Sequence, residues 1–158
     1  MKDSLTTGIS FGMTSGAITT LGLMVGLHSG THSRLIVIGG ILTIAIADAF
    51  SDALGIHISE ESENVHTAKQ IWVASVATFL SKLIFALTFV VPVLIFRLDT
   101  AILVGVFWGL GVLALLSCCI ARAQGKRKLP VIAEHILIAL IVIMATHFVG
   151  DLISRLVD

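Results

Sequence analysis

The sequence predicts an all-α membrane protein with five transmembrane helices, and three observations lead to this fold class. The chain has 158 residues, of which 56% are hydrophobic, whereas roughly half of the residues of a soluble domain must face water. The apolar residues gather into five continuous runs, each close to the length of about 20 residues that spans a bilayer. These runs do not alternate apolar and polar residues, which excludes a transmembrane β-barrel.

The first helix is expected over residues 7–27, which are rich in glycine. At 100° per residue its small residues fall within an arc of about 120°. They are Gly8, Gly12, Ser15, Gly16, Thr19, Gly22 and Gly26. Small residues spaced by four allow another helix to approach closely. We therefore predict a packing face, which serves a helix of the same chain, a dimer contact with a second subunit or the lining of a pore.

The other four helices are expected over residues 35–58, 71–96, 101–120 and 130–157. Short polar segments separate the five, namely "HSGTHSR", "SEESENVHTAKQ", "RLDT" and "ARAQGKRK". Asp99 or Thr100 can cap the fourth helix, and Pro130 suits the first turn of the fifth. The whole chain, residues 1–158, is therefore expected to form a single transmembrane domain.

Lysine and arginine in the loops indicate the orientation, because these residues are enriched on the cytoplasmic side of membrane proteins. One side would carry six of them and the other three: Lys2, Lys69, Arg122, Lys126, Arg127 and Lys128 against Arg34, Arg97 and Arg155. We expect the N-terminus inside and the C-terminus outside, in the cell membrane. Because five helices cannot divide into two equal halves, any two-fold pathway would require a homodimer.

Three charged residues lie deep in the expected spans, where such residues usually pair with one another or carry function. At 1.5 Å per residue, Asp48 lies roughly 15 Å, Lys82 roughly 16 Å and Asp52 roughly 9 Å below the cytoplasmic surface. The equal depths predict an ion pair between Asp48 and Lys82, which would join the second and third helices. Asp52 has no basic residue at its depth, so we expect it to bind a metal ion or carry a proton. Asp48 is either a second ligand or only the partner of Lys82.

Further carboxylates and imidazoles lie toward the same side of the membrane as Asp52. Such a set suits a dication of intermediate hardness, Fe(II) or Mn(II). The candidate metal ligands are Asp48, Asp52, His57, Glu60, Glu61, Glu63 and Glu134. Two plainer interpretations stay open, in which the glutamates after residue 59 form a solvated loop and Glu134 is an acid at a helix start, favoured by the dipole. A weaker alternative is an exit-side site made from His28, His32, His147 and Asp151.

Composition and motifs exclude several other classes of protein. Ten Lys and Arg balance ten Asp and Glu, which leaves no basic surface for nucleic acid. Cys118 and Cys119 are adjacent, without the spacing of a metal site or a disulfide framework. The chain contains no HExxH, GxSxG or other catalytic spacing, so we expect neither an enzyme nor a bound cofactor.

Nearly the whole chain resembles the vacuolar iron transporter family. The stretches that carry the resemblance are "FGMTSGAITTLGLMVGL", "AFSDALGIHISEES" and "ALLSCCIARAQGKRKLPVIAEHILIALIVIMATHFVGDLI". The resemblance implies five transmembrane helices in a homodimer that moves Fe(II), and often Mn(II), out of the cytoplasm in exchange for protons. The chain would be a short form, because the family's glutamate-rich cytoplasmic domain is reduced here to residues 59–70.

Two positions depart from the family's pattern. Members commonly have an aspartate where Ser15 stands here, and a methionine where Asp52 stands. The acid has moved from one helix to another, which keeps a carboxylate in the pathway. The predicted function is therefore export of a divalent metal, Fe2+ or Mn2+, which is the transported substrate. The alternative is a non-transporting membrane subunit or scaffold whose intramembrane charges only pair helices.

Overall fold

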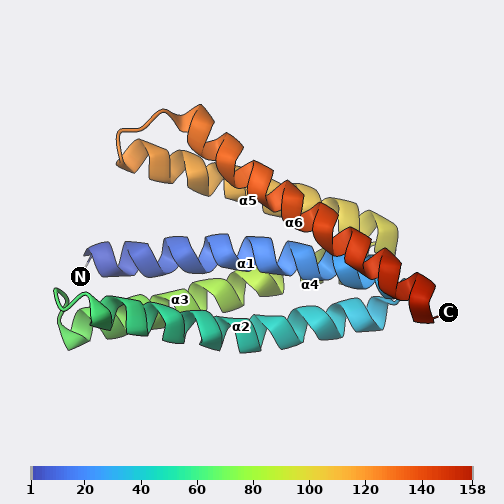
Figure 1. Cartoon of the computed structure of the whole chain (residues 1–158), viewed down its shortest axis with the longest axis horizontal. Helices are drawn as coiled ribbons and strands as arrows, with labels where there is room; N and C mark the ends of the chain where they lie inside the picture. Colours follow the sequence, from blue (N-terminus) through green and yellow to red (C-terminus); the bar gives the residue numbers. More distant parts are fainter. Residues whose placement is uncertain (1, 158) are drawn as a thin grey trace.

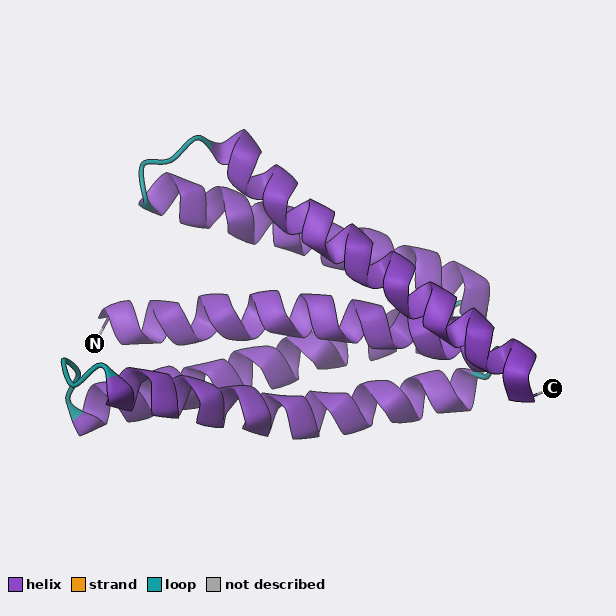
Figure 2. Cartoon of the chain, viewed as in Figure 1, coloured by secondary structure: helices purple, strands orange, loops and turns teal. Residues whose placement is uncertain are grey.

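The computed structural model describes residues 2–157, and it folds them into six helices joined by short loops (Figures 1 and 2). The helices are α1 (Lys2–Thr31), α2 (Arg34–Ser62), α3 (Ala68–Thr88), α4 (Val90–Ile95), α5 (Leu98–Ala123) and α6 (Lys128–Val157). Five helical segments are long and apolar enough to cross a membrane, with α3 and α4 together forming one of them. The predicted all-α fold with five potential spans is confirmed for the described residues.

The helices are longer than the apolar runs that predicted them. α1 begins at Lys2 and not at residue 7, and α2 continues to Ser62, beyond the predicted end at residue 58. The start of α3 is fixed by a capping box, in which the Thr67 hydroxyl accepts from the Gln70 backbone N–H and the Gln70 side chain accepts from the Thr67 backbone N–H. These helices therefore extend into the polar residues beyond their apolar runs, and they end at caps and turns.

The predicted helix over residues 71–96 is interrupted at Phe89, between α3 and α4. A proline inside a helix lacks an N–H group, and its ring clashes with the carbonyl four residues earlier. For Pro92 that residue is Thr88, the last residue of α3. The Thr88 hydroxyl accepts a hydrogen bond of 3.0 Å from the indole N–H of Trp108, so α5 is tied to the chain at this break.

The first helix lies at the centre of the fold, since α1 packs on α2, α3, α5 and α6. α1, α2 and α3 run side by side, whereas the hairpin of α5 and α6 diverges from them toward the end that holds the N-terminus (Figure 1). In this opening lies a cleft of about 660 Å³, lined by α1 residues such as Thr7 and Ser10, by Cys119 of α5 and by Gln124, which follows α5.

The small-residue face predicted on α1 is covered by two helices of the same chain. A Cβ on Gly8 would clash with the backbone carbonyl of Ala74, and one on Gly12 with Ser81, both of α3. Farther along α1, a Cβ on Gly26 would lie 3.2 Å from the carbonyl oxygen of Thr146 in α6. The predicted packing face thus lies against α3 in its first half and against α6 in its second, and it admits close backbone contact in both.

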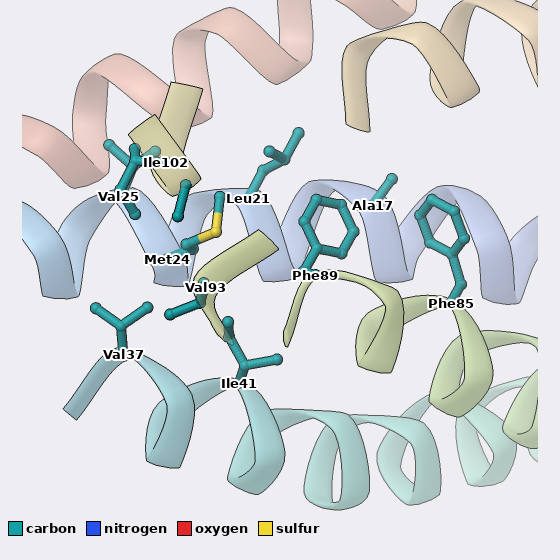
Figure 3. Close-up of a cluster of buried hydrophobic side chains, with 11 residues drawn as sticks. Ala17, Leu21, Met24, Val25, Val37, Ile41, Phe85, Phe89, Val93 and Ile102 are labelled. Carbon is teal, nitrogen blue, oxygen red and sulfur yellow. The ribbon is translucent and has the colours of Figure 1, made fainter. Parts of the chain in front are cut away.

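Buried apolar side chains gather in the half of the molecule away from the N-terminus (Figure 3). Leu21 and Met24 of α1 meet Ile41 of α2 and Phe89 and Val93 of the third span there, all fully or almost fully buried. The outer surface is also apolar, and in α6 only Ala139 and Gly150 are buried. Such a surface suits a chain whose outward-facing side chains contact lipid.

Candidate functional site

The most polar feature inside the helix bundle is the ammonium group of Lys82. This residue lies in α3, is only 1% exposed, and reaches between α1 and α2. Its Nζ lies 2.5 Å from Oδ2 of Asp48, donates to Oδ2 of Asp52, and donates to the Ser15 hydroxyl at 2.8 Å. The ammonium carries three N–H donors, so three oxygen neighbours from two helices surround it. We call Asp48, Asp52, Lys82 and Ser15 the Lys82 cluster.

Local helix geometry explains how the Lys82 cluster assembles. Asp48 and Asp52 are one turn apart on α2, which places both carboxylates on one face of that helix. Ser15 presents its hydroxyl from α1, and Gly16 beside it leaves space for the lysine stem, because a Cβ there would lie 3.3 Å from Lys82 Cγ. The hydroxyls of Ser75 and Thr78, on the buried face of α3, bond to carbonyls of their own helix and leave the ammonium to the carboxylates.

The structure joins Asp48 to Lys82, as equal depth predicts, but it corrects the expectation for Asp52. Asp52 was predicted to have no basic partner, yet it contacts the same ammonium as Asp48. Counting depth along helix axes treats each residue as a point, whereas lysine carries its charge on a flexible four-carbon stem. That reach brings Lys82 to both carboxylates of α2.

The Lys82 cluster keeps a formal charge of −1, from two carboxylates and one ammonium. A charge buried at membrane depth is costly, and it attracts a compensating cation or proton. The side chains of Asp48 and Asp52 are 24% and 17% exposed while that of Lys82 is 1% exposed, although Oδ2 of Asp48 is itself buried. A groove of about 590 Å³ between α1 and α2, whose polar lining includes Thr43, Asp48 and Ser51, leads to the site.

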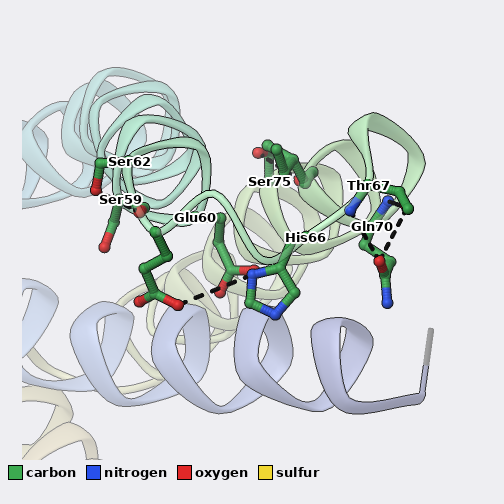
Figure 4. A network of polar contacts seen from close by, with 9 residues as sticks. Ser59, Glu60, Ser62, His66, Thr67, Gln70 and Ser75 are labelled. Atoms are coloured by element: carbon green, nitrogen blue, oxygen red, sulfur yellow. Dashed lines mark hydrogen bonds and ion pairs between the residues drawn. The ribbon is translucent and has the colours of Figure 1, made fainter.

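The glutamates after residue 59 lie at the end of α2, two turns or more beyond Asp52. Figure 4 shows Glu60 beside His66. Glu60 is buried, and its Oε2 lies 3.0 Å from Nδ1 of His66. Glu63 approaches the same nitrogen at 3.9 Å, and Glu61 is exposed. This group ties the α2–α3 loop to the end of α2 through His66 when the imidazole is protonated.

His57 also lies away from the glutamates. Its Nδ1 is 3.1 Å from the Ser75 hydroxyl, and its ring stands edge-on to Trp72 at 4.8 Å. These residues line a mainly apolar groove between α2 and α3. His57 therefore makes polar contact with α3, not with the acidic residues one turn later.

Glu134 is exposed near the start of α6, a helix that packs on α1 and α5 and has no comparable contact with α2. The structure therefore does not bring Glu134 to Asp52. Its neighbour His135 turns to α5, where Nδ1 lies 2.7 Å from the Ser117 hydroxyl. The grouping of Glu134 with Asp52 was predicted from their similar depth, but similar depth does not show which helices are neighbours.

At the opposite end of the bundle, His28 lies 3.4 Å from Asp99 of α5, and the rings of His28 and His32 are 5.2 Å apart. Asp151 pairs instead with Arg155 on its own helix, at 2.8 Å. Across residues 2–157, no three His, Cys, Asp or Glu side chains are grouped closely enough to hold a metal ion. The candidate ligands are thus divided among separate places: Asp48 and Asp52 meet at Lys82, and Glu60 and Glu63 meet at His66.

Sequence reasoning missed Ser15 as a member of the site. It was assigned to the packing face as a small residue, but its hydroxyl is also a hydrogen-bond acceptor for the buried ammonium. A signal was present, because the family resemblance places an acid at this position in other members. Comparison with known proteins adds nothing to this geometry: no protein-family model, no curated protein and no solved structure matches the chain.

Proposed function

We propose that this chain is a divalent transition-metal transporter of the vacuolar iron transporter type, which exports Fe2+ or Mn2+ from the cytoplasm in exchange for protons. The observation that carries the proposal is the Lys82 cluster, where two aspartates at membrane depth share one ammonium and one of them, Asp48, lines a groove between α1 and α2. Ionisable residues at such depth commonly mark ion pathways.

The contacts of Ser15 and Asp52 support the link to that family. These are the two positions at which the sequence departs from the pattern, with the acid absent at residue 15 and present at residue 52. Both side chains contact the same Lys82 nitrogen. An acid transferred between these two positions therefore stays in the same part of the bundle, which is the expected result if a pathway must retain its carboxylate.

The proposed setting is a homodimer in the cell membrane, with the N-terminus in the cytoplasm. The N-terminus, the start of α3 and the connection between α5 and α6 lie at one end of the bundle (Figure 1). Together they carry six of the ten lysines and arginines, which favours that end as the cytoplasmic side. Gly8 and Gly12 already pack on α3. A second copy would therefore cover other faces, such as the exposed apolar sides of α2 and α6.

A second candidate function is a membrane subunit or scaffold in which the Lys82 cluster only joins helices. The near-complete burial of Lys82 favours this reading, as does the lack of a three-ligand metal group among residues 2–157. Both functions are compatible with an ion pair between Lys82 and the two aspartates. Only transport requires Asp48 and Asp52 to exchange the ammonium for another cation.

Flux measurements in vesicles separate the two functions. Purified protein in liposomes that contain a Mn2+-sensitive dye should admit Mn2+ and move protons in the opposite direction. Asp52→Asn should abolish this flux, whereas Asp151→Asn, which alters an exposed pair with Arg155, should keep it. Absence of flux in the wild type, with the protein folded, would favour the scaffold.

A further inference from the structure

The position of the Lys82 ammonium coincides with the position that a cation held by α2 would take. Both Asp48 and Asp52 direct Oδ2 at the same nitrogen. An ion bound between these carboxylates would use the same oxygen atoms. In the described structure the space between the two acids is therefore filled by a cation that belongs to the chain.

We propose that Lys82 is a tethered competitor of the transported ion, which lowers the affinity of the site for a dication and so allows release. This inference rests on the proposed transport function and adds the residue that sets its affinity. Conduction needs a site that binds ions and also lets them leave. A pair of buried aspartates without a lysine would bind a dication far more tightly.

Charge counting gives the direction of the effect. With the ammonium in place, the Lys82 cluster has a charge of −1, and a dication added to it leaves an uncompensated +1. Without the ammonium the two carboxylates carry −2, which a dication neutralises. Since an uncompensated charge is costly at this depth, Lys82 disfavours the divalent complex, and its removal favours it.

The surroundings of Lys82 make the competition direct. The side chain is 1% exposed, and its stem lies against Gly16 of α1. The charged partners that the structure gives it are Asp48 and Asp52, with Ser15 as the neutral one. No third carboxylate from α1, α2 or α3 contacts the ammonium, so an entering ion meets the lysine at the same two acids.

The test replaces the lysine and asks whether a metal ion can take its place. Lys82→Met and Lys82→Gln are purified in detergent, and their thermal midpoints are measured against Mn2+, with choline chloride at equal ionic strength as the control salt. Both variants should melt below the wild type without Mn2+ and recover as Mn2+ is added. Their apparent Kd for Mn2+ should be at least about tenfold lower than that of the wild type, since one repelling unit charge at contact distance is removed.

Matched variants show whether the effect belongs to the site. Lys82→Arg keeps the positive charge and should bind Mn2+ as weakly as the wild type. Lys82→Met combined with Asp52→Asn removes one acid and should lose the recovery by Mn2+.

Two outcomes would overturn the inference. In one, Lys82→Met and Lys82→Gln bind Mn2+ no more tightly than the wild type. In the other, both fail to fold even with Mn2+ present throughout purification, which would make Lys82 a structural residue only. The proposed function fails separately, if the wild type carries no Mn2+ flux while the variants bind the ion tightly.

Discussion

The first and the last helix of this chain differ both in mean hydropathy and in how much of each is buried inside the bundle. The span in α1 has a mean hydropathy of 1.3 and is half buried inside the bundle, whereas the span in α6 has a mean hydropathy of 2.4 and is 11% buried. In water the more apolar segment would be the more buried one. Here glycine and hydroxyl residues lie inside, where helices approach closely, and large apolar residues face outward.

The same contrast separates the group of α1, α2 and α3 from the hairpin of α5 and α6. The three-helix group packs closely enough to enclose an ammonium and two carboxylates. The acids of the hairpin, such as Glu134 and Asp151, are partly or fully exposed. Close packing around small residues is therefore what allows this chain to keep charge inside.

The largest effect should come from removing both acids of the Lys82 cluster. Asp48→Ala with Asp52→Ala leaves the ammonium buried with only Ser15 as a polar partner, which should cost about 3–5 kcal/mol of stability, as for other broken buried pairs. Either single change leaves a neutral pair and should cost less. Reversible unfolding in mixed micelles would measure this. As the control, Asp151→Ala in the hairpin breaks an exposed ion pair and should cost about 1 kcal/mol of stability or less. An equal loss of stability in both variants would contradict the difference between the three-helix group and the hairpin.

A second effect should come from filling the contact between α1 and α3. Gly12→Leu places a side chain against Ser81 and Thr78, which should destabilise the protein by about 1–3 kcal/mol or more through overpacking. Gly111→Leu in α5 is the matched control, because nothing lies within 4 Å of its Cβ position. Thermal midpoints of the two variants would be compared. A Gly111 variant that melts as low as the Gly12 variant would show that helix propensity or insertion, not packing, decides the result.

A smaller loss is expected inside the hairpin itself. Ser117→Ala removes the hydroxyl that faces His135 Nδ1 at 2.7 Å. The loss of one such hydrogen bond should cost about 0.5–1.5 kcal/mol. Comparing this variant with Ser117→Thr, which keeps the hydroxyl, separates the hydrogen bond from the change in volume. If both variants melt like the wild type, the contact holds the hairpin together only weakly.

The last prediction concerns the reactivity of Cys119 with a maleimide, and it involves the smallest change in stability. This exposed residue lines the cleft between α1 and α5, which also contains the polar side chains of Thr7, Ser10 and Gln124. In a Cys118→Ala background, a membrane-impermeant maleimide should label Cys119 from the side of the N-terminus. A cysteine at Ala77, which is 8% exposed and packed against Gly8, should resist labelling in a chain without the native cysteines. Equal labelling of the two positions would mean that the three-helix group opens as readily as the cleft.

Much of the fold could be predicted because bilayer thickness imposes a length on every span. The apolar runs located five spans, but the interruption at Phe89 was missed although Pro92 was visible in the sequence. Helix ends were also misplaced, since residues such as Thr67 and Gln70 fix the start of α3 through hydrogen bonds that hydropathy does not register.

The site was less predictable than the fold. Depth along the helices brought Asp48 to Lys82, because depth is what residue counting measures. It did not register the second contact to Asp52, which depends on the length and direction of the lysine side chain. It also could not tell that α6 lies away from α2, because the neighbours of a helix depend on packing between surfaces and not on distance from the membrane boundary.

The contact between Gly150 of α6 and the backbone of Gly26 and Gly30 has a mechanical consequence. Together with the contacts of Val142 and Thr146 to Gly22 and Gly26, it holds the second half of α6 on α1. Residues 128–141 of α6 then extend beyond these contacts for about 20 Å at 1.5 Å per residue. A rotation of α6 by about 10° about these glycine contacts would move the far end of the helix by about 4 Å. Side chains near the glycine contacts would hardly shift, whereas the cleft between α1 and α5 would become wider or narrower.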